Sequence, residues 1–391
     1  MGLNYYCQIF VRSLTVIDIQ DTEIVSAAKN LGYIDLLRGM AILMVIIIHT
    51  SLTVNGLSPF VSYVAQYGQM GVQLFFLASA YTLCCSHVRR IGEQNSWRSF
   101  FIRRFFRIAP LYYLGIIGYF LLEPYVHILN IIKLPDAQYN FVNIFANILF
   151  VHGFVMSANN NIVPGGWSIG TEMAFYLLFP ALFSLCIWVD KFWGILGLYS
   201  LVGFSIFLNL IIQSILAKVF SISISNSSFV YFNLINQLPV FLLGTLVFFH
   251  HHRGVRIQLS IRTQSTLLAV ITIAVILLLQ IGQSWVFKII PTCTGISFVF
   301  LLNVLKELKY SNIFLEKIGR VSYSMYIVHF MFVWWLIPGI MSLVKKGVLP
   351  ELLLICSLGL AVGLSYSIAT ISQKYIETPG VKLGKLLISR L

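Results

Sequence analysis

The sequence predicts an all-α polytopic membrane protein, a helical bundle of about ten transmembrane helices with both termini in the cytoplasm. Apolar residues fill 58% of the 391 positions and charged residues only 10%, against about 25% charged residues in soluble domains. The apolar residues form repeated runs of about 20, the helix length that crosses a bilayer. Most Lys and Arg residues lie in the short segments between these runs, as topology signals do.

Eleven apolar segments are candidates for membrane spans, and ten of them are expected to cross. The exception is 141–157, where Asn140, Asn143 and Asn147 recur at helical spacing and make one face polar and wet. This pattern favours a helix that lies at the interface or re-enters. The ten expected spans are near 39–57, 70–86, 108–122, 168–189, 192–213, 229–249, 265–282, 286–305, 322–343 and 350–372.

The distribution of basic residues supports this topology. If the N-terminus is cytoplasmic and 141–157 does not cross, 21 Lys and Arg residues lie inside and five outside. If that segment did cross, the basic stretches 250–262 and 306–320 and the C-terminal tail would all move outside, against the positive-inside rule.

The chain divides into an N-terminal extension with no assigned role (1–32), a transmembrane domain (33–376) and a cytoplasmic basic tail (377–391). The extension lacks the apolar core of a cleavable signal. A net charge of +13 does not indicate a nucleic-acid partner, because no basic soluble domain is present. The six cysteines lack metal-ligand spacing and resemble small packing residues. Three consecutive histidines at 250–252 would point about 100° apart on a helix, so no metal site is expected.

The first span carries Arg38 and His49 on one face. Eleven helical residues turn through about 1100° and rise about 16 Å, roughly half of the bilayer core. Arg38 is therefore expected near a membrane surface and His49 near the middle, where an ionisable residue usually has a function. Histidine exchanges a proton near neutral pH. The alternatives are a histidine that only bonds a neighbouring helix, and an ion pair of Asp35 with Arg38 that only anchors the span.

An arginine cluster precedes the third span. Arg103, Arg104 and Arg107 lie just before Pro110, where a span can begin. Three guanidinium groups at a membrane surface suit a phosphorylated ligand, because each can bind two phosphate oxygens. A plain topology signal, or attraction to anionic lipids, explains the cluster too.

A polar stripe begins the span near 168–189, on the outer side in this topology. Ser168, Glu172, Phe175 and Tyr176 share one helical face, and Trp167 precedes them. A carboxylate at this depth needs a partner, water or a hydroxyl-rich substrate. The tryptophan is either an interfacial belt residue or a stacking platform for a sugar.

A fourth stripe places Ser322, Tyr326 and His329 on one face of the span near 322–343. Hydrogen bonding between membrane helices explains this stripe without a substrate. No nucleophile elbow and no phosphate-binding glycine loop is present.

Together these motifs resemble those of the acyltransferase-3 family, membrane acyltransferases that acylate sugars and polysaccharides. The resemblance covers residues 33–376, including a second-span segment that carries Ala80 where the family usually has glycine. Its most specific parts are the Arg-x10-His pair Arg38 and His49, the run Arg107-Ile108-Ala109-Pro110, the stripe from Trp167 to Tyr176, and the stripe from Ser322 to His329.

The resemblance implies a cytoplasmic acyl-CoA donor, usually acetyl-CoA, and a carbohydrate or lipid-linked glycan acceptor such as O-antigen of lipopolysaccharide. It implies a place in the bacterial inner membrane and no metal. His49 would be the general base and Arg38 would orient the donor, while Glu172 would bind sugar hydroxyls or orient the base. Direct transfer and an acyl-enzyme on Ser322 or Tyr326 both stay open. Arg103, Arg104 and Arg107 would hold the CoA phosphates, and Trp167, Ser168, Tyr326 and His329 would contact the acceptor.

A proton-coupled transporter or flippase for a lipid-linked sugar is the alternative function. It would use the same buried histidine and carboxylate. The sequence shows no inverted repeat, and its membrane-surface arginines cluster on one side, which favours the acyltransferase.

Overall fold

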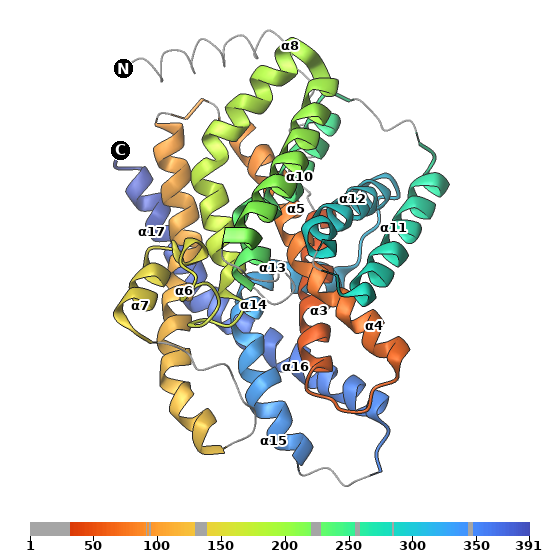
Figure 1. Cartoon of the computed structure of the whole chain (residues 1–391). Helices are drawn as coiled ribbons and strands as arrows, with labels where there is room; N and C mark the ends of the chain where they lie inside the picture. Colours follow the sequence, from red (N-terminus) through yellow and green to blue (C-terminus); the bar gives the residue numbers. More distant parts are fainter. Residues whose placement is uncertain are drawn as a thin grey trace.

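The computed structural model describes residues 32–90, 92–93, 95–129, 139–219, 228–254, 259–283, 285–342 and 347–391. Over these residues the chain is a bundle of helices without a β-strand (Figure 1). The predicted all-α class is therefore confirmed. The N-terminal extension lies outside the described residues, except for Gly32.

Nine helical stretches of the described residues are long and apolar enough to cross a membrane. The longest, α8 (Gly166–Val219), is broken at Gly194, which has φ 62° and ψ −155°. Figure 1 shows the two legs of α8 meeting at a bend, and each leg exceeds the length of about 20 residues that a span needs. Counting the legs separately gives the ten predicted spans. The other stretches are built from α3 (Gly32–Ser51), α4 (Pro59–Tyr67) with α5 (Gly71–Val88), α6 (Ser96–Leu129), α10 (Leu234–His252), α11 (Ile261–Ile281), α12 (Val286–Glu307), α14 (Ser322–Met331) with α15 (Ile337–Ser342), and α16 (Pro350–Ser372) with α17 (Thr378–Ile388).

The segment expected not to cross contains a short helix, α7 (Phe141–Ile148), and a single 3-10 turn at His152–Phe154. Eight residues rise about 12 Å, too little to span a bilayer, as predicted. The predicted wet face is wet only at Asn140, which is exposed; Asn143 and Asn147 are buried, whereas Phe141 is exposed. The Tyr112 hydroxyl donates to Asn147 Oδ1 at 2.7 Å. The polar face thus points into the protein because it has hydrogen-bond partners there.

Two helices begin earlier than predicted. α3 begins at Gly32 and α6 at Ser96, so the arginine cluster lies within a helix rather than before one. Pro110 has no N–H for the carbonyl of Phe106. That carbonyl oxygen lies 2.8 Å from where a Cβ of Gly380 would be, so α17, predicted as a tail, lies against α6 (Figure 1).

A short helix, α13 (Ile313–Arg320), lies where a loop was expected. It packs closely on α3, because a Cβ on Gly39 would lie 2.2 Å from the Leu315 carbonyl oxygen. A Cβ on Gly319 would lie 1.7 Å from the carbonyl oxygen of Asp35. Glycines at both positions therefore permit the contact that fixes the first turns of α3.

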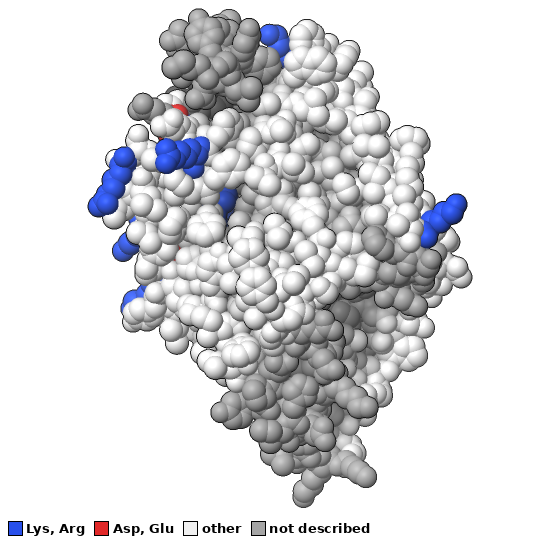
Figure 2. Space-filling view, turned by 60° about the vertical axis from the view of Figure 1, so that its left-hand side comes forward, with Lys and Arg blue, Asp and Glu red and all other residues white. Residues whose placement is uncertain are grey.

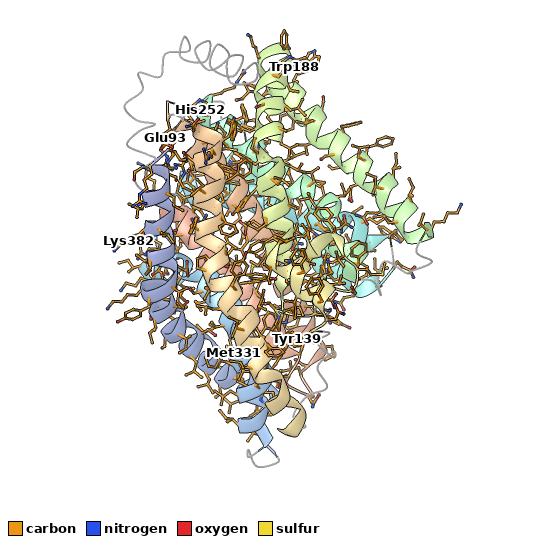
Figure 3. All side chains as sticks on the ribbon, turned by 90° about the vertical axis from the view of Figure 1, so that its left-hand side faces the viewer. Glu93, Tyr139, Trp188, His252, Met331 and Lys382 are labelled. Carbon is orange, nitrogen blue, oxygen red and sulfur yellow. The ribbon has the colours of Figure 1, made fainter. Side chains whose placement is uncertain are left out.

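Two segments predicted to be cytoplasmic lie at the same end of the bundle. Figure 3 shows Glu93 and His252 in the upper part and Tyr139 in the lower part, while Lys382, from the predicted cytoplasmic tail, lies between them. Most Lys and Arg side chains on the face in Figure 2 lie along its top and left side, with one further group at the right edge, and most of the remaining described surface is uncharged. A largely uncharged surface is what a protein embedded in a bilayer requires.

Candidate functional site

A partly open cavity lies where α3, α5, α6, α8 and α14 meet. Each of the four motifs singled out in the sequence contributes at least one residue to its wall. The polar lining residues are Arg38, Ser79, Arg104, Arg107, Ser168, Glu172, Tyr176, Ser322, Tyr323 and Tyr326, and the apolar ones are Val72, Phe75, Phe76, Ile108 and Ile169.

Three guanidinium groups line the cavity. Arg38 donates to the Thr82 hydroxyl at 3.1 Å, and its closest carboxylate contact is with Asp35 at 3.9 Å. The Arg104 guanidinium carbon lies 5.6 Å from the ring centre of Tyr176, and its buried Nε has no hydrogen-bond partner. Neither Arg104 nor Arg107 forms an ion pair with a described residue. These groups are therefore available to a bound anion.

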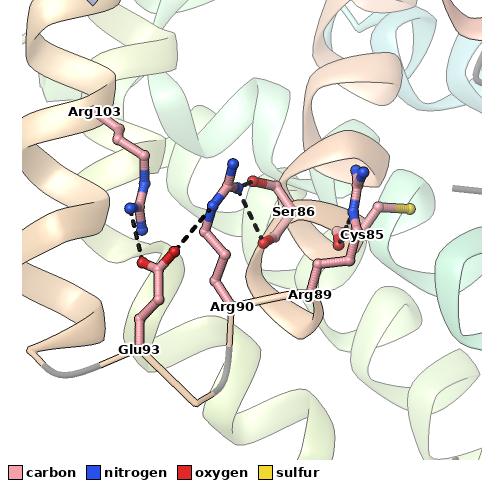
Figure 4. Close-up of polar contacts among 6 residues, drawn as sticks. All are labelled: Cys85, Ser86, Arg89, Arg90, Glu93 and Arg103. Atoms are coloured by element: carbon pink, nitrogen blue, oxygen red, sulfur yellow. Dashed lines mark hydrogen bonds and ion pairs between the residues drawn. The ribbon is translucent and has the colours of Figure 1, made fainter. Parts of the chain in front are cut away.

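Arg103 does not line this cavity. It pairs with Glu93 at 2.8 Å, and Glu93 also lies 3.4 Å from Arg90 (Figure 4). Consecutive helical residues point about 100° apart, so Arg103 and its neighbour Arg104 face different surroundings. The structure thus separates the predicted arginine cluster into two cavity residues and one surface ion pair.

Glu172 is held at the cavity wall by two hydroxyl groups. Ser79 donates to its carboxylate at 2.5 Å, and the Tyr176 hydroxyl also donates to it. Ser79 was not predicted as a site residue. The signal was present, because Val72, Phe76 and Ser79 lie at i, i+4 and i+7, on one helical face.

Ser168 and Tyr326 form a hydrogen-bonded pair in the cavity wall. Ser168 donates to the Tyr326 hydroxyl at 2.8 Å, and Tyr326 donates to the Gly165 carbonyl at 3.0 Å. Gly165 has φ +74°, and a Cβ there would lie 2.9 Å from the Tyr326 hydroxyl. Glycine is therefore needed for this turn. Trp167 does not line the cavity: its ring stacks on Phe232 with centroids 4.0 Å apart.

His49 lies beyond the cavity, against α14. Its ring centroid is 5.5 Å from that of His329 and 4.5 Å from that of Phe330. His329 is fully buried and follows Tyr326 by one turn. One stripe of α14 therefore runs from Ser322 and Tyr326 at the cavity to the histidine pair.

His152 supports the start of α8 and was not singled out from the sequence. Its Nε2 donates to the Gly166 carbonyl at 2.9 Å, and a Cβ on Gly170 would lie 2.6 Å from the same nitrogen. Burial lowers the pKa of His152 below 6.5, so the ring is neutral near pH 7. This contact fixes the turn from which Ser168 and Glu172 project.

The family model of an acyltransferase domain, acyltransferase-3, matches residues 31–370. No curated protein and no solved structure shows significant similarity to the chain.

Proposed function

The chain belongs to the acyltransferase-3 family, and from that premise we propose that it transfers an acyl group, acetyl in the simplest case, from cytoplasmic acyl-CoA to a hydroxyl of an exported glycan such as O-antigen. We place it in the inner membrane of a bacterium. The observation that carries the proposal is the cavity in which three guanidinium groups accompany a single carboxylate.

The donor suits the charge of this cavity. CoA carries phosphate groups, which guanidinium groups bind through two parallel charge-assisted hydrogen bonds. Arg104 and Arg107 are three residues apart on α6 and share a face. Arg38 reaches the cavity from α3, and we assign it the thioester end of the donor, where it stabilises negative charge as it develops.

We assign proton transfer to His49. It takes the proton of the acceptor hydroxyl while that oxygen attacks the thioester carbonyl carbon. The carbon–sulfur bond then breaks, and the CoA thiolate receives the proton from His49. His49 is partly exposed and lies outside the cavity wall. The acceptor hydroxyl is therefore assigned to meet the donor thioester at the α14 stripe, between the cavity and His49.

We also assign Glu172 and Trp167 to the acceptor, but only Glu172 lines the cavity. Glu172 lines the cavity, where its carboxylate can accept from a sugar hydroxyl. Trp167 stacks on Phe232, so a sugar that stacks on this ring must first displace Phe232.

Mass analysis of surface glycans from cells with and without the gene tests the proposal. Loss of only the acyl group is expected. Loss of the whole glycan would instead indicate transport of the lipid-linked sugar, and an unchanged glycan would refute both functions.

A further inference from the structure

Two imidazoles lie close together between α3 and α14, that of His49 partly exposed and that of His329 buried, and each has a ring nitrogen without a partner. The centroids of His49 and His329 are 5.5 Å apart. Nδ1 of His49 and Nε2 of His329 are both buried and make no hydrogen bond. An unsatisfied polar atom is costly in a membrane bundle, and two of them on adjacent rings indicate an interaction between them.

The backbone fixes which nitrogen of His329 carries hydrogen. Nδ1 of His329 lies 2.8 Å from the carbonyl oxygen of Tyr326 and 3.3 Å from that of Met325. A carbonyl oxygen can only accept, so Nδ1 is the donor. In a neutral imidazole the other nitrogen is then an acceptor. Nε2 of His329 therefore offers a lone pair in the direction of α3.

Nε2 of His329 can supply the hydrogen-bond acceptor that His49 needs if it is to act as a general base. If His49 is to take a proton on Nε2, its Nδ1 must carry the hydrogen, and a partner must hold that tautomer. A third group behind the base is a recurring part of such sites. Phe330 and Trp334 also surround His49, and neither ring can accept this hydrogen bond.

We propose that His329 is a positioning residue for His49 in the acyl transfer proposed above, on which this inference rests. In this proposal Nδ1–H of His49 donates to Nε2 of His329 through one bridging water, or directly after a small rotation of the rings. Nε2 of His49 then presents its lone pair to the acceptor hydroxyl. When His49 takes the proton, its Nδ1–H keeps the same partner, so the imidazolium is stabilised without a buried carboxylate.

Steady-state kinetics of the full chain in proteoliposomes tests the pairing, with acetyl-CoA and the purified glycan as substrates. His329→Leu should lower kcat by about 10–100-fold, as loss of an orienting partner typically does, with both KM values nearly unchanged. His329→Gln keeps an acceptor near the position of Nε2 and should retain most of the activity. Phe330→Leu alters the packing of the same His49 ring without removing an acceptor, so its kcat should change far less.

The double variant separates positioning from a structural role. Because both residues act as one unit, adding His329→Leu to His49→Gln should cause no further loss. Additive losses, or a normal kcat for His329→Leu, would overturn the pairing while leaving the proposed function intact. If the leucine variant does not insert, His329→Gln should still exceed His329→Asn, whose oxygen is one methylene short, and equal rates would overturn the pairing. Absence of transfer by the wild type would refute the proposed function and the pairing together.

Discussion

Replacing Arg104 and Arg103 separately by Gln distinguishes a donor site from a topology signal. The two side chains are adjacent in sequence, yet only Arg104 lines the cavity. Arg104 forms no ion pair with a described residue, so its removal leaves no partner charge unpaired. The expected loss is therefore one charge-assisted contact with a donor phosphate, about 1.5–3 kcal/mol.

That free energy corresponds to an increase of about 10–150-fold in the KM for acyl-CoA, at tenfold per about 1.4 kcal/mol. The acceptor KM should stay unchanged. Arg103→Gln breaks a partly exposed ion pair with Glu93, which costs about 0.2–1 kcal/mol of stability. It should leave the donor KM within about twofold. Initial rates in membranes with varied acyl-CoA measure both. A normal donor KM for Arg104→Gln, or an equal increase for Arg103→Gln, would refute the assignment.

Three further predictions concern the packing around His152 and the membrane topology. Gly170→Ala should displace His152 and lower activity by more than tenfold, since the new Cβ would lie 2.6 Å from Nε2 of His152. Gly203→Ala is the control and should be active, because no atom lies within 4 Å of its Cβ. Equal activities of the two variants would contradict this prediction. Burial lowers the pKa of His152 in the folded protein. As pH falls below 6.5, His152 therefore binds a proton in the unfolded chain before it does so in the folded protein, and the free energy of unfolding decreases. The difference in thermal stability between wild type and His152→Gln should therefore shrink from pH 7 to pH 5, and a constant difference would show that His152 does not titrate on unfolding. Reporter fusions after residues 95 and 255 should be cytoplasmic, and an external residue 255 would overturn the charge argument.

Local periodicity predicted much of the fold. The apolar runs indicated ten spans, and the 3.6-residue period placed Ser168 with Glu172 and Ser322 with Tyr326 on single helical faces. The structure confirms these faces, because all four residues line one cavity. These patterns involve only residues that are near in sequence, so they predict the shared face correctly where the whole segment forms one helix.

Contacts between distant segments were not predictable in this way. The helix around Arg103 and Arg104 was expected to begin at 108, so the divergence of the two side chains was missed. The partner of Trp167 is Phe232, 65 residues away, and no spacing rule joins them. The short helix α13 lies in 306–320, which was treated only as a basic segment between spans, and its stability depends on packing against α3.

Transfer of labelled acetyl from acetyl-CoA to the glycan by His49→Gln tests the central claim most directly. Gln has a similar size and can hydrogen-bond, but it cannot accept a proton near pH 7, so it separates chemistry from packing. The variant should insert and fold like the wild type and lose transfer by about 10²–10⁴-fold, the usual range for a removed acid–base group. Substantial transfer by this variant would show that His49 is a structural hydrogen-bonding residue and that the base lies elsewhere.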